Sequence, residues 1–212
     1  AHVYMVARSA EKLKRLKDSI KGKCETIVCD LSDLKAVRNC AKIFLSDVSS
    51  GKISGLDVLI LNAGVMALKH RQETQQGFEK QVGVNHIAHY TLTKLLLPAL
   101  QKSAPSRIVS VSSSAHRMCD PVYILDQQNV NLETIPYDPW IAYVVVVFER
   151  ERHQNVNHIT DILLAPMFEE YTLVTFSKIS TLEQQQLSKT QVRKLKVLER
   201  SLCGIFESNV CW

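Results

Sequence analysis

Residues that could bind a small molecule recur in the first two thirds of this sequence. Arg8 carries a guanidinium group that could form charge-assisted hydrogen bonds with a phosphate. Asp30 could accept a hydrogen bond from an exocyclic amine, although turn or cap aspartates are also common. The small residues of Asn62-Ala63-Gly64 would leave room for a ligand at the end of a strand, and a ligand-free tight turn is the alternative. Asn85 interrupts an apolar helical stretch, which is locally unfavourable, and a solvated asparagine on the outer face of the helix is the alternative to a functional role.

Other residue types argue against a metal site. The histidines at 86, 89 and 116 have no carboxylate or cysteine partner at ligand spacing, and we expect structural roles for them. The cysteines at 24, 29, 40, 119, 203 and 211 form no C-x-x-C pair. Scattered cysteines favour reduced thiols and an intracellular, cytoplasmic location over a disulfide framework. We predict no metal.

These candidate residues follow short apolar segments that alternate with amphipathic ones. Strands are predicted over 2–6, 24–29, 56–61 and 107–112, and a long helix over about 77–101. A first helix carries Leu13, Leu16 and Ile20 at helical spacing and could be capped by Ser9. A second helix, capped by Ser32 or Asp33, should bury one face made of Val37, Cys40, Ala41, Phe44 and Val48.

Short continuous apolar strands between helices indicate an α/β fold with a parallel sheet covered on both faces. Ligands bind such sheets beyond the carboxyl ends of the strands. Arg8, Asp30, residues 62–64 and the serine triplet 112–114 all follow predicted strands. The sequence therefore predicts a Rossmann-like, doubly wound sheet with a binding site along one edge.

The composition changes after Tyr143. Residues 144–212 contain one glycine, Gly204, and one proline, Pro166, although ligand-binding β/α units need glycine in their turns. Ser180 and Glu183 form a capping box before an amphipathic helix predicted to extend to about residue 202. We therefore expect a partial dinucleotide-binding domain over 1–143 and a divergent, mostly helical tail over 144–212.

Three ordered motifs resemble the short-chain dehydrogenase/reductase family. They are Leu59-Ile60-Leu61-Asn62-Ala63-Gly64, Gly83-Val84-Asn85-His86, and the segment from Arg107 to His116. Within the family the chain looks like the retinol dehydrogenase and WW-domain oxidoreductase branch, because Trp140-Ile141-Ala142-Tyr143 follows a long polar insert. The resemblance covers residues 1–143. It implies a glycine-rich turn before Ala1, so the fold is expected to be truncated at its N-terminus.

The resemblance also implies roles for the candidate residues in cofactor binding. Arg8 would face the adenosine ribose and favour NADP over NAD, and Asp30 with Leu31 would contact the adenine. Asn62, Ala63 and Gly64 would border the cofactor.

The same resemblance implies a set of catalytic residues. Asn85 would hold a water of the proton relay, Ser113 would orient the substrate oxygen, and Tyr143 would exchange a proton with it. The serine triplet leaves the register ambiguous by one residue. A free tyrosine has a pKa of about 10 and needs a nearby cation to act near neutral pH. The family supplies a lysine four residues after the tyrosine, where this sequence has Val147.

Composition narrows the classes of partner. The net charge is +5, without a dense basic tract or interleaved aromatic residues, so a nucleic-acid partner is not expected. No apolar run reaches the length of a membrane span, but membrane association through residues before Ala1 stays open. The expected substrate is a lipophilic alcohol or carbonyl of retinoid or steroid type. Two alternatives are a non-catalytic variant that binds a protein through the helix over 180–202, and a chain that does not fold stably. The oligomeric state is undetermined.

Overall fold

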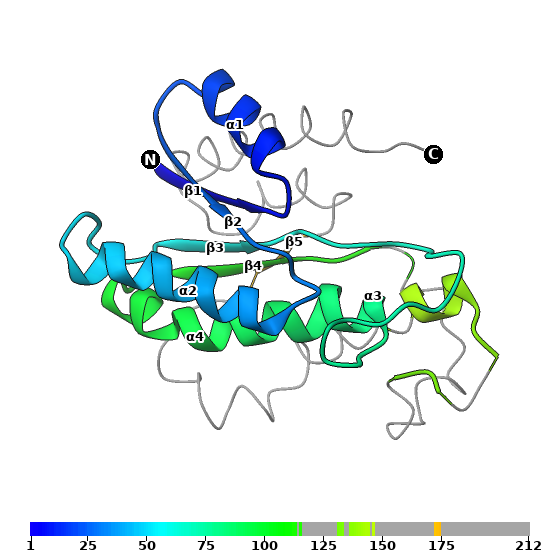
Figure 1. Ribbon diagram of the computed structural model, residues 1–212. Coiled ribbons are helices and arrows are strands. Elements are labelled where there is room, and N and C mark those ends of the chain that lie inside the picture. Colours follow the sequence, from blue (N-terminus) through cyan, green and yellow to red (C-terminus); the bar gives the residue numbers. More distant parts are fainter. Residues whose placement is uncertain (114, 116–130, 134–135, 145, 147–171, 175–212) are drawn as a thin grey trace. The chain divides into compact units, whose positions relative to one another are not determined.

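The computed structural model describes residues 1–113, 115, 131–133, 136–144, 146 and 172–174 (Figure 1). The chain divides into two compact units, Ala1–Leu173 and Val174–Trp212. All described residues except Val174 belong to the first unit. The helix predicted over 180–202, and Val147, lie outside the described residues.

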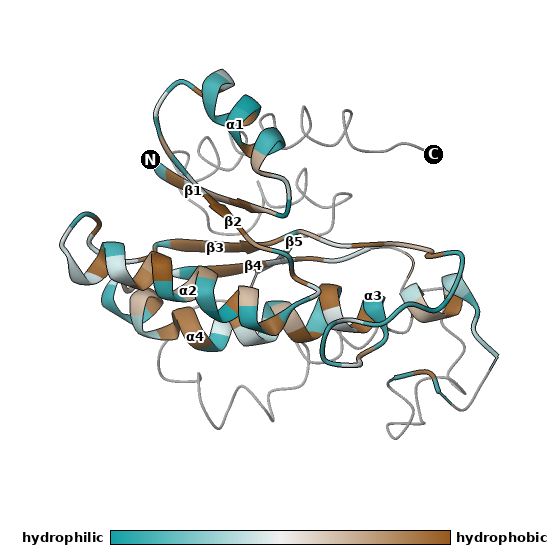
Figure 2. Cartoon of the chain, viewed as in Figure 1, coloured by the Kyte–Doolittle hydropathy of each residue, from teal (hydrophilic) through white to brown (hydrophobic). Residues whose placement is uncertain are grey.

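The chain begins with a parallel pair of strands. β1 (His2–Ala7) pairs with β2 (Lys23–Val28), with His2 opposite Lys23 and Ala7 opposite Val28. Helix α1 (Ala10–Ser19) connects them, and its N-cap is Ser9, whose Oγ accepts a hydrogen bond from the Lys12 N–H at 3.2 Å. Leu13 is the buried residue of α1, and Figure 2 shows most of the helix surface as hydrophilic. The predicted cap is confirmed.

Helix α2 (Leu34–Ser49) follows β2. Its N-cap is Asp33, one of the two predicted candidates, and the Asp33 carboxylate accepts a hydrogen bond from the Lys35 N–H at 2.9 Å. The predicted apolar face is confirmed, because the buried residues of this helix are Val37, Cys40, Ala41, Phe44 and Val48.

A second sheet contains β3 (Val58–Leu61), β4 (Arg107–Val111) and β5 (Thr172–Val174), in that order, and β3 and β4 are parallel. Val58 lies opposite Arg107, and Leu61 lies opposite Ser110. The predicted combination of parallel strands and covering helices is confirmed. Among the described residues no strand hydrogen bonds to both β1 and β3, so the predicted sheet is divided into two.

One helical run connects β3 to β4. It consists of α3 (Lys80–Val82), the π-helical turn η1 (Gly83–Ile87) and α4 (Ala88–Lys102), close to the predicted 77–101. The π-helical turn contains Asn85, the residue singled out for interrupting the apolar pattern. Single π-helical turns inside α-helices are frequent at functional sites.

The hydrophobic core extends over elements of both sheets. One cluster of buried residues includes Ile27 of β2, Phe44 of α2, Leu59 of β3, Leu96 of α4 and Ile108 of β4. Helices α2 and α4 lie side by side in this cluster (Figure 1). In this shared core, β3 and β4 pack against α4, which belongs to the same helical run as Asn85.

Candidate active site at the carboxyl ends of the strands

Arg8 and Asp30 lie just beyond the carboxyl ends of β1 and β2. The parallel pairing continues past the strands, because the Cys29 N–H donates to the Ala7 carbonyl at 2.9 Å. Both Arg8 and Asp30 are exposed. The Asp30 Oδ1 accepts hydrogen bonds from the N–H and the hydroxyl of Ser32, at 2.9 and 2.8 Å. This turn leaves Oδ2 without a protein donor among the described residues.

The second group of predicted residues follows β3 and β4. Because Leu61 and Ser110 are opposite each other, the segment 62–64 and the serines at 112 and 113 leave neighbouring strands at the same edge. Asn62 is half-buried, whereas Ala63 and Gly64 are exposed. The structure therefore places a small-residue turn beside a pair of hydroxyl groups.

Asn85 is buried and holds this turn through its side-chain amide. Its Oδ1 accepts a hydrogen bond from the Val65 N–H, and its Nδ2 donates to the Val65 carbonyl, both at 2.8 Å. A Cβ added to Gly64 would lie 3.1 Å from the Asn85 Oδ1. Asn85 therefore fixes the backbone of the turn, and the lack of a side chain at Gly64 allows its close approach.

The serine hydroxyls differ in their surroundings. The Ser113 Oγ accepts a hydrogen bond from the Ala115 N–H at 3.2 Å. The Ser112 Oγ is buried and has no hydrogen-bond partner among the described residues. Ser113 stays the predicted substrate-orienting residue, and Ser112 is the neighbour to test against it.

Tyr143 belongs to a short helical segment that includes residues 139–144 and 146. Asp138 caps this segment, because its Oδ1 accepts hydrogen bonds from the N–H groups of Trp140 and Ile141, both at 2.8 Å. Tyr143 is half-buried, while Val144 and Val146 are 4% and 2% exposed. These two valines therefore contribute to the core.

Gln81, which the sequence pattern did not single out, is a buried polar residue that hydrogen bonds both to the loop after β3 and to the segment before Tyr143. Gln81 is fully buried, and its Oε1 accepts a hydrogen bond from the Ala67 N–H at 2.9 Å. Its Nε2 donates to the Tyr137 hydroxyl at 3.2 Å and to the Pro139 carbonyl at 3.1 Å. The visible signal was a glutamine at the start of an apolar helical run, and its partners lie too far away in sequence to be inferred.

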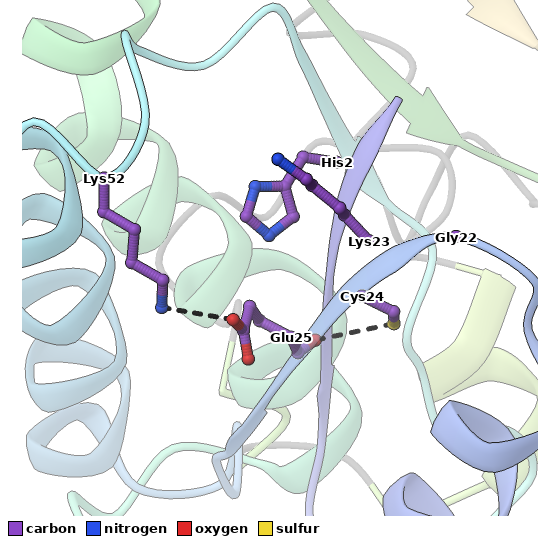
Figure 3. A pocket seen from close by; sticks show the side chains of 6 residues that line it. All are labelled: His2, Gly22, Lys23, Cys24, Glu25 and Lys52. Atoms are coloured by element: carbon purple, nitrogen blue, oxygen red, sulfur yellow. Dashed lines mark hydrogen bonds and ion pairs between the residues drawn. The ribbon is translucent and has the colours of Figure 1, made fainter.

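A hollow near the amino ends of β1 and β2 lies at the opposite end of these strands from Arg8 and Asp30. Its lining includes His2, Lys23, Cys24, Glu25 and Lys52 (Figure 3). The Lys52 ammonium forms ion pairs with Glu25 at 3.2 Å and with Asp47 at 2.9 Å. These hydrogen bonds raise the pKa of Lys52 and lower the pKa of Glu25, and the pKa of Asp47 is lowered by hydrogen bonds from the Tyr4 hydroxyl and from Lys52. The Lys52 ammonium is thus paired with two carboxylates of the protein.

Two kinds of feature are absent from the described part of the chain, a metal-binding cluster and a membrane-spanning helix. No group of three or more histidine, cysteine or acidic side chains there could hold a metal ion. No helix in the same part is long and apolar enough to cross a membrane.

The comparisons with known proteins indicate the family of this chain. The family model described as short chain dehydrogenase matches residues 1–124. Human retinol dehydrogenase 11 is 45% identical over 123 residues, which cover 56% of this chain and 37% of that protein. Human retinol dehydrogenase 13 is 35% identical over 162 residues, covering 71% of this chain and 45% of that protein. The chain thus spans about two fifths of the length of these relatives.

Two solved structures are similar to this chain. An uncharacterized protein from Mycobacterium paratuberculosis has a TM-score of 0.67 and 31% identity, with 82% of this chain and 58% of that one covered. A metagenomic short-chain oxidoreductase in complex with NADP has a TM-score of 0.58 and 23% identity, with 82% and 70% covered. The second similarity concerns the fold alone.

Proposed function

This chain belongs to the short-chain dehydrogenase family, close to its retinol dehydrogenase branch, and from this premise we propose that it contains the site of an NADP-dependent oxidoreductase for lipophilic alcohols and carbonyls. One observation carries the proposal. The turn 62–64 and the serines 112 and 113 leave paired strands at the same edge, and Asn85 holds the turn through both ends of its amide.

The described residues fit the two ends of a nicotinamide dinucleotide. Arg8 offers an exposed cation beside the N-terminus of α1, and the partial positive charge of that helix end favours an anion. The unengaged Oδ2 of Asp30, with Leu31 beside it, suits an exocyclic amine. At the other sheet, the exposed small residues Ala63 and Gly64 leave the strand end uncovered by large side chains. The basic residue at position 8 supports NADP over NAD.

The side chains of this chain would then act on the substrate oxygen. NADP, when bound, supplies or accepts a hydride. Ser113 orients the substrate oxygen, and Tyr143 exchanges a proton with it. Asn85 keeps in place the backbone at Val65, next to the residues 62–64 that would border the cofactor. Val147 stands where the family has a lysine, so the cation that would assist proton transfer by Tyr143 is missing, and we propose that turnover by this chain is impaired.

Two exposed apolar side chains support a lipophilic substrate. Met66 is 52% exposed and Trp140 is 51% exposed. Met66 precedes Ala67 and Trp140 follows Pro139, and a single carboxamide, that of Gln81, hydrogen bonds to the backbone of Ala67 and of Pro139. The backbone next to Met66 and the backbone next to Trp140 are therefore held by one side chain, and we propose that the two exposed apolar side chains hold an apolar substrate.

The proposal is tested by cofactor binding and by turnover. NADPH fluorescence should show saturable binding to the unmodified chain, tighter than that of NADH. Reduction of a medium-chain aldehyde should be slow in the unmodified chain and faster in Val147→Lys. Val147→Lys combined with Tyr143→Phe is the control, and it should return turnover to background. No NADPH binding by either protein would contradict the proposal.

The second candidate function is a non-catalytic variant that acts through protein partners. The observation that favours it is Val147, because the sequence keeps the tyrosine and lacks its activating lysine. NADPH binding without turnover, even in Val147→Lys, would support this candidate. Pull-downs with and without residues 180–212 would then locate the interaction, and identical partners would exclude that segment.

A further inference from the structure

The Gln81 carboxamide is the centre of a polar network that the proposed mechanism does not use. Gln81 and Glu79 are both 0% exposed, at the start of the helical run that contains Asn85. Buried polar side chains usually have hydrogen-bond partners, and removing a partner costs more than the bond itself contributes. We call the set Glu79, Gln81 and Tyr137 the buried clamp.

The donors and acceptors of the buried clamp are matched. Tyr137 donates its hydroxyl hydrogen to the Glu79 Oε1 at 3.2 Å and accepts from the Gln81 Nε2 at 3.2 Å. The Glu79 Oε2 accepts from the Val82 N–H at 2.8 Å, which caps the helical run. Burial and the charge of Glu79 raise the pKa of Tyr137, so its hydroxyl stays a donor at neutral pH.

The clamp connects two segments that are distant in the sequence. On one side, Gln81 holds the N–H of Ala67, three residues after Gly64 and at a positive φ of 49°. On the other side, it holds the carbonyl of Pro139, one helical turn before Tyr143. Asn85, one turn after Gln81, holds Val65 of the same loop.

We infer that Gln81 is a positioning residue that fixes the Tyr143 helix relative to the cofactor loop 62–67. This inference rests on the proposed function for its catalytic consequence. Its structural content, a single side chain that restrains both segments, does not depend on that function. A misplacement of about 1 Å between reacting groups can lower a rate by about a hundredfold, so such a restraint affects kcat.

The test compares Gln81→Met with Gln76→Met. Methionine keeps the length of the side chain and removes both hydrogen-bonding ends. Gln76 is the matched control, because it is exposed and its amide also makes two hydrogen bonds, with the Leu34 N–H and the Asp33 carboxylate. Hydrogen exchange should become faster in Gln81→Met at Ala67 and at residues 140–142 together, and at neither place in Gln76→Met.

A second variant separates the two sides of the clamp. Tyr137→Phe removes one partner of the Gln81 Nε2, so exchange should rise at residues 140–142 and stay unchanged at Ala67. This milder variant also tests the inference if Gln81→Met fails to fold. Unchanged exchange at residues 140–142 in Tyr137→Phe, or acceleration at only one segment in Gln81→Met, would overturn the inference.

The kinetic arm distinguishes positioning from general stability. In the Val147→Lys background, Gln81→Met should lower kcat about tenfold or more. NADPH binding should be weakened by a smaller factor than kcat, because Arg8 and Asp30 are untouched while the loop 62–67 loses only the restraint at Ala67. A normal kcat with faster exchange would reduce Gln81 to a structural role. If the unmodified chain does not bind NADPH at all, the proposed function fails, while the exchange experiment still decides whether the clamp exists.

Discussion

The side-chain amide of Asn85 makes a reciprocal pair of hydrogen bonds with the backbone of Val65, each at 2.8 Å. A leucine at position 85 would have a similar size and would leave the Val65 N–H and carbonyl without these partners. We expect Asn85→Leu to lower the free energy of unfolding by about 1–3 kcal/mol and to weaken NADPH binding. Denaturant unfolding and a fluorescence titration measure both effects. The control is Asn39→Leu, at an exposed position of α2, and an equal loss there would contradict this role for Asn85.

Gly64 is tightly placed against the same amide. An added Cβ would lie 3.1 Å from the Asn85 Oδ1 and 3.4 Å from its Cγ. We expect Gly64→Ala to destabilise the chain by about 1 kcal/mol, because the Asn85 amide must move away from Val65. The penalty should be smaller in an Asn85→Ala background. Equal penalties in the two backgrounds, measured by chemical denaturation, would show that the close contact is not the cause.

Tyr4 of β1 donates a hydrogen bond to the carboxylate of Asp47 in α2. Its hydroxyl donates to the Asp47 Oδ2 at 2.6 Å, while its ring packs edge-on against Phe44. We expect Tyr4→Phe to keep the ring contact and to lose about 1 kcal/mol of stability at pH 7. This hydrogen bond lowers the pKa of Asp47, and burial with the Asp47 interaction raises the pKa of Tyr4 to about 12, so the hydroxyl stays protonated.

The pH dependence of that loss has a definite sign. A carboxyl group whose pKa is lowered by folding contributes stability above its unfolded pKa of about 3.9, and this contribution is lost as the pH falls through the folded value. The difference between Tyr4→Phe and the unmodified chain should therefore shrink below about pH 4. Thermal unfolding at pH 7 and pH 3 measures it, with the exposed Tyr90→Phe as the control. A pH-independent difference would rule out the carboxylate as the cause.

Arg8 should discriminate between the two nicotinamide cofactors. A hydrogen bond to a charged group contributes about 1.5–3 kcal/mol, so Arg8→Met should weaken NADPH binding about tenfold or more. Binding of NADH should change little, because NADH lacks the extra phosphate. Arg15→Met, in the exposed part of α1, is the matched control. Equal weakening of both cofactors would place Arg8 elsewhere than at the 2′-phosphate.

Met66 and Trp140 should set the preference for apolar substrates. Burial of each methylene contributes about 0.8 kcal/mol, so an apolar surface at these residues favours long aldehydes over short ones. We expect the double variant Met66→Ser and Trp140→Ser, made with Val147→Lys, to reduce the ratio of kcat/KM for decanal over butanal about tenfold. Ile43→Ser, at an exposed apolar position of α2, is the control. An unchanged ratio would exclude these residues from the substrate site.

Local features of the sequence were enough to predict the elements. The buried face of α2 follows directly from the helical spacing of Val37, Cys40, Ala41, Phe44 and Val48. Ser9 and Asp33 are side chains that cap the next turn of chain. Such patterns depend on residues within a few positions of one another. The fold class and the order of strands and helices could therefore be inferred from the sequence alone.

The hydrogen-bond partners within the candidate site could be identified only from the tertiary structure. The role of Asn85 in holding a water stays a prediction, and the structure adds that its amide bonds to Val65, twenty residues away in the chain. Gln81 was overlooked, because a glutamine near the start of a helix is ordinarily solvated and its partners lie 14 to 58 residues away. The sequence by itself determined the types of chemical group that gather at the strand ends. Only the packed chain decided which backbone groups those side chains hold, because these hydrogen bonds form between segments that meet only when the core assembles.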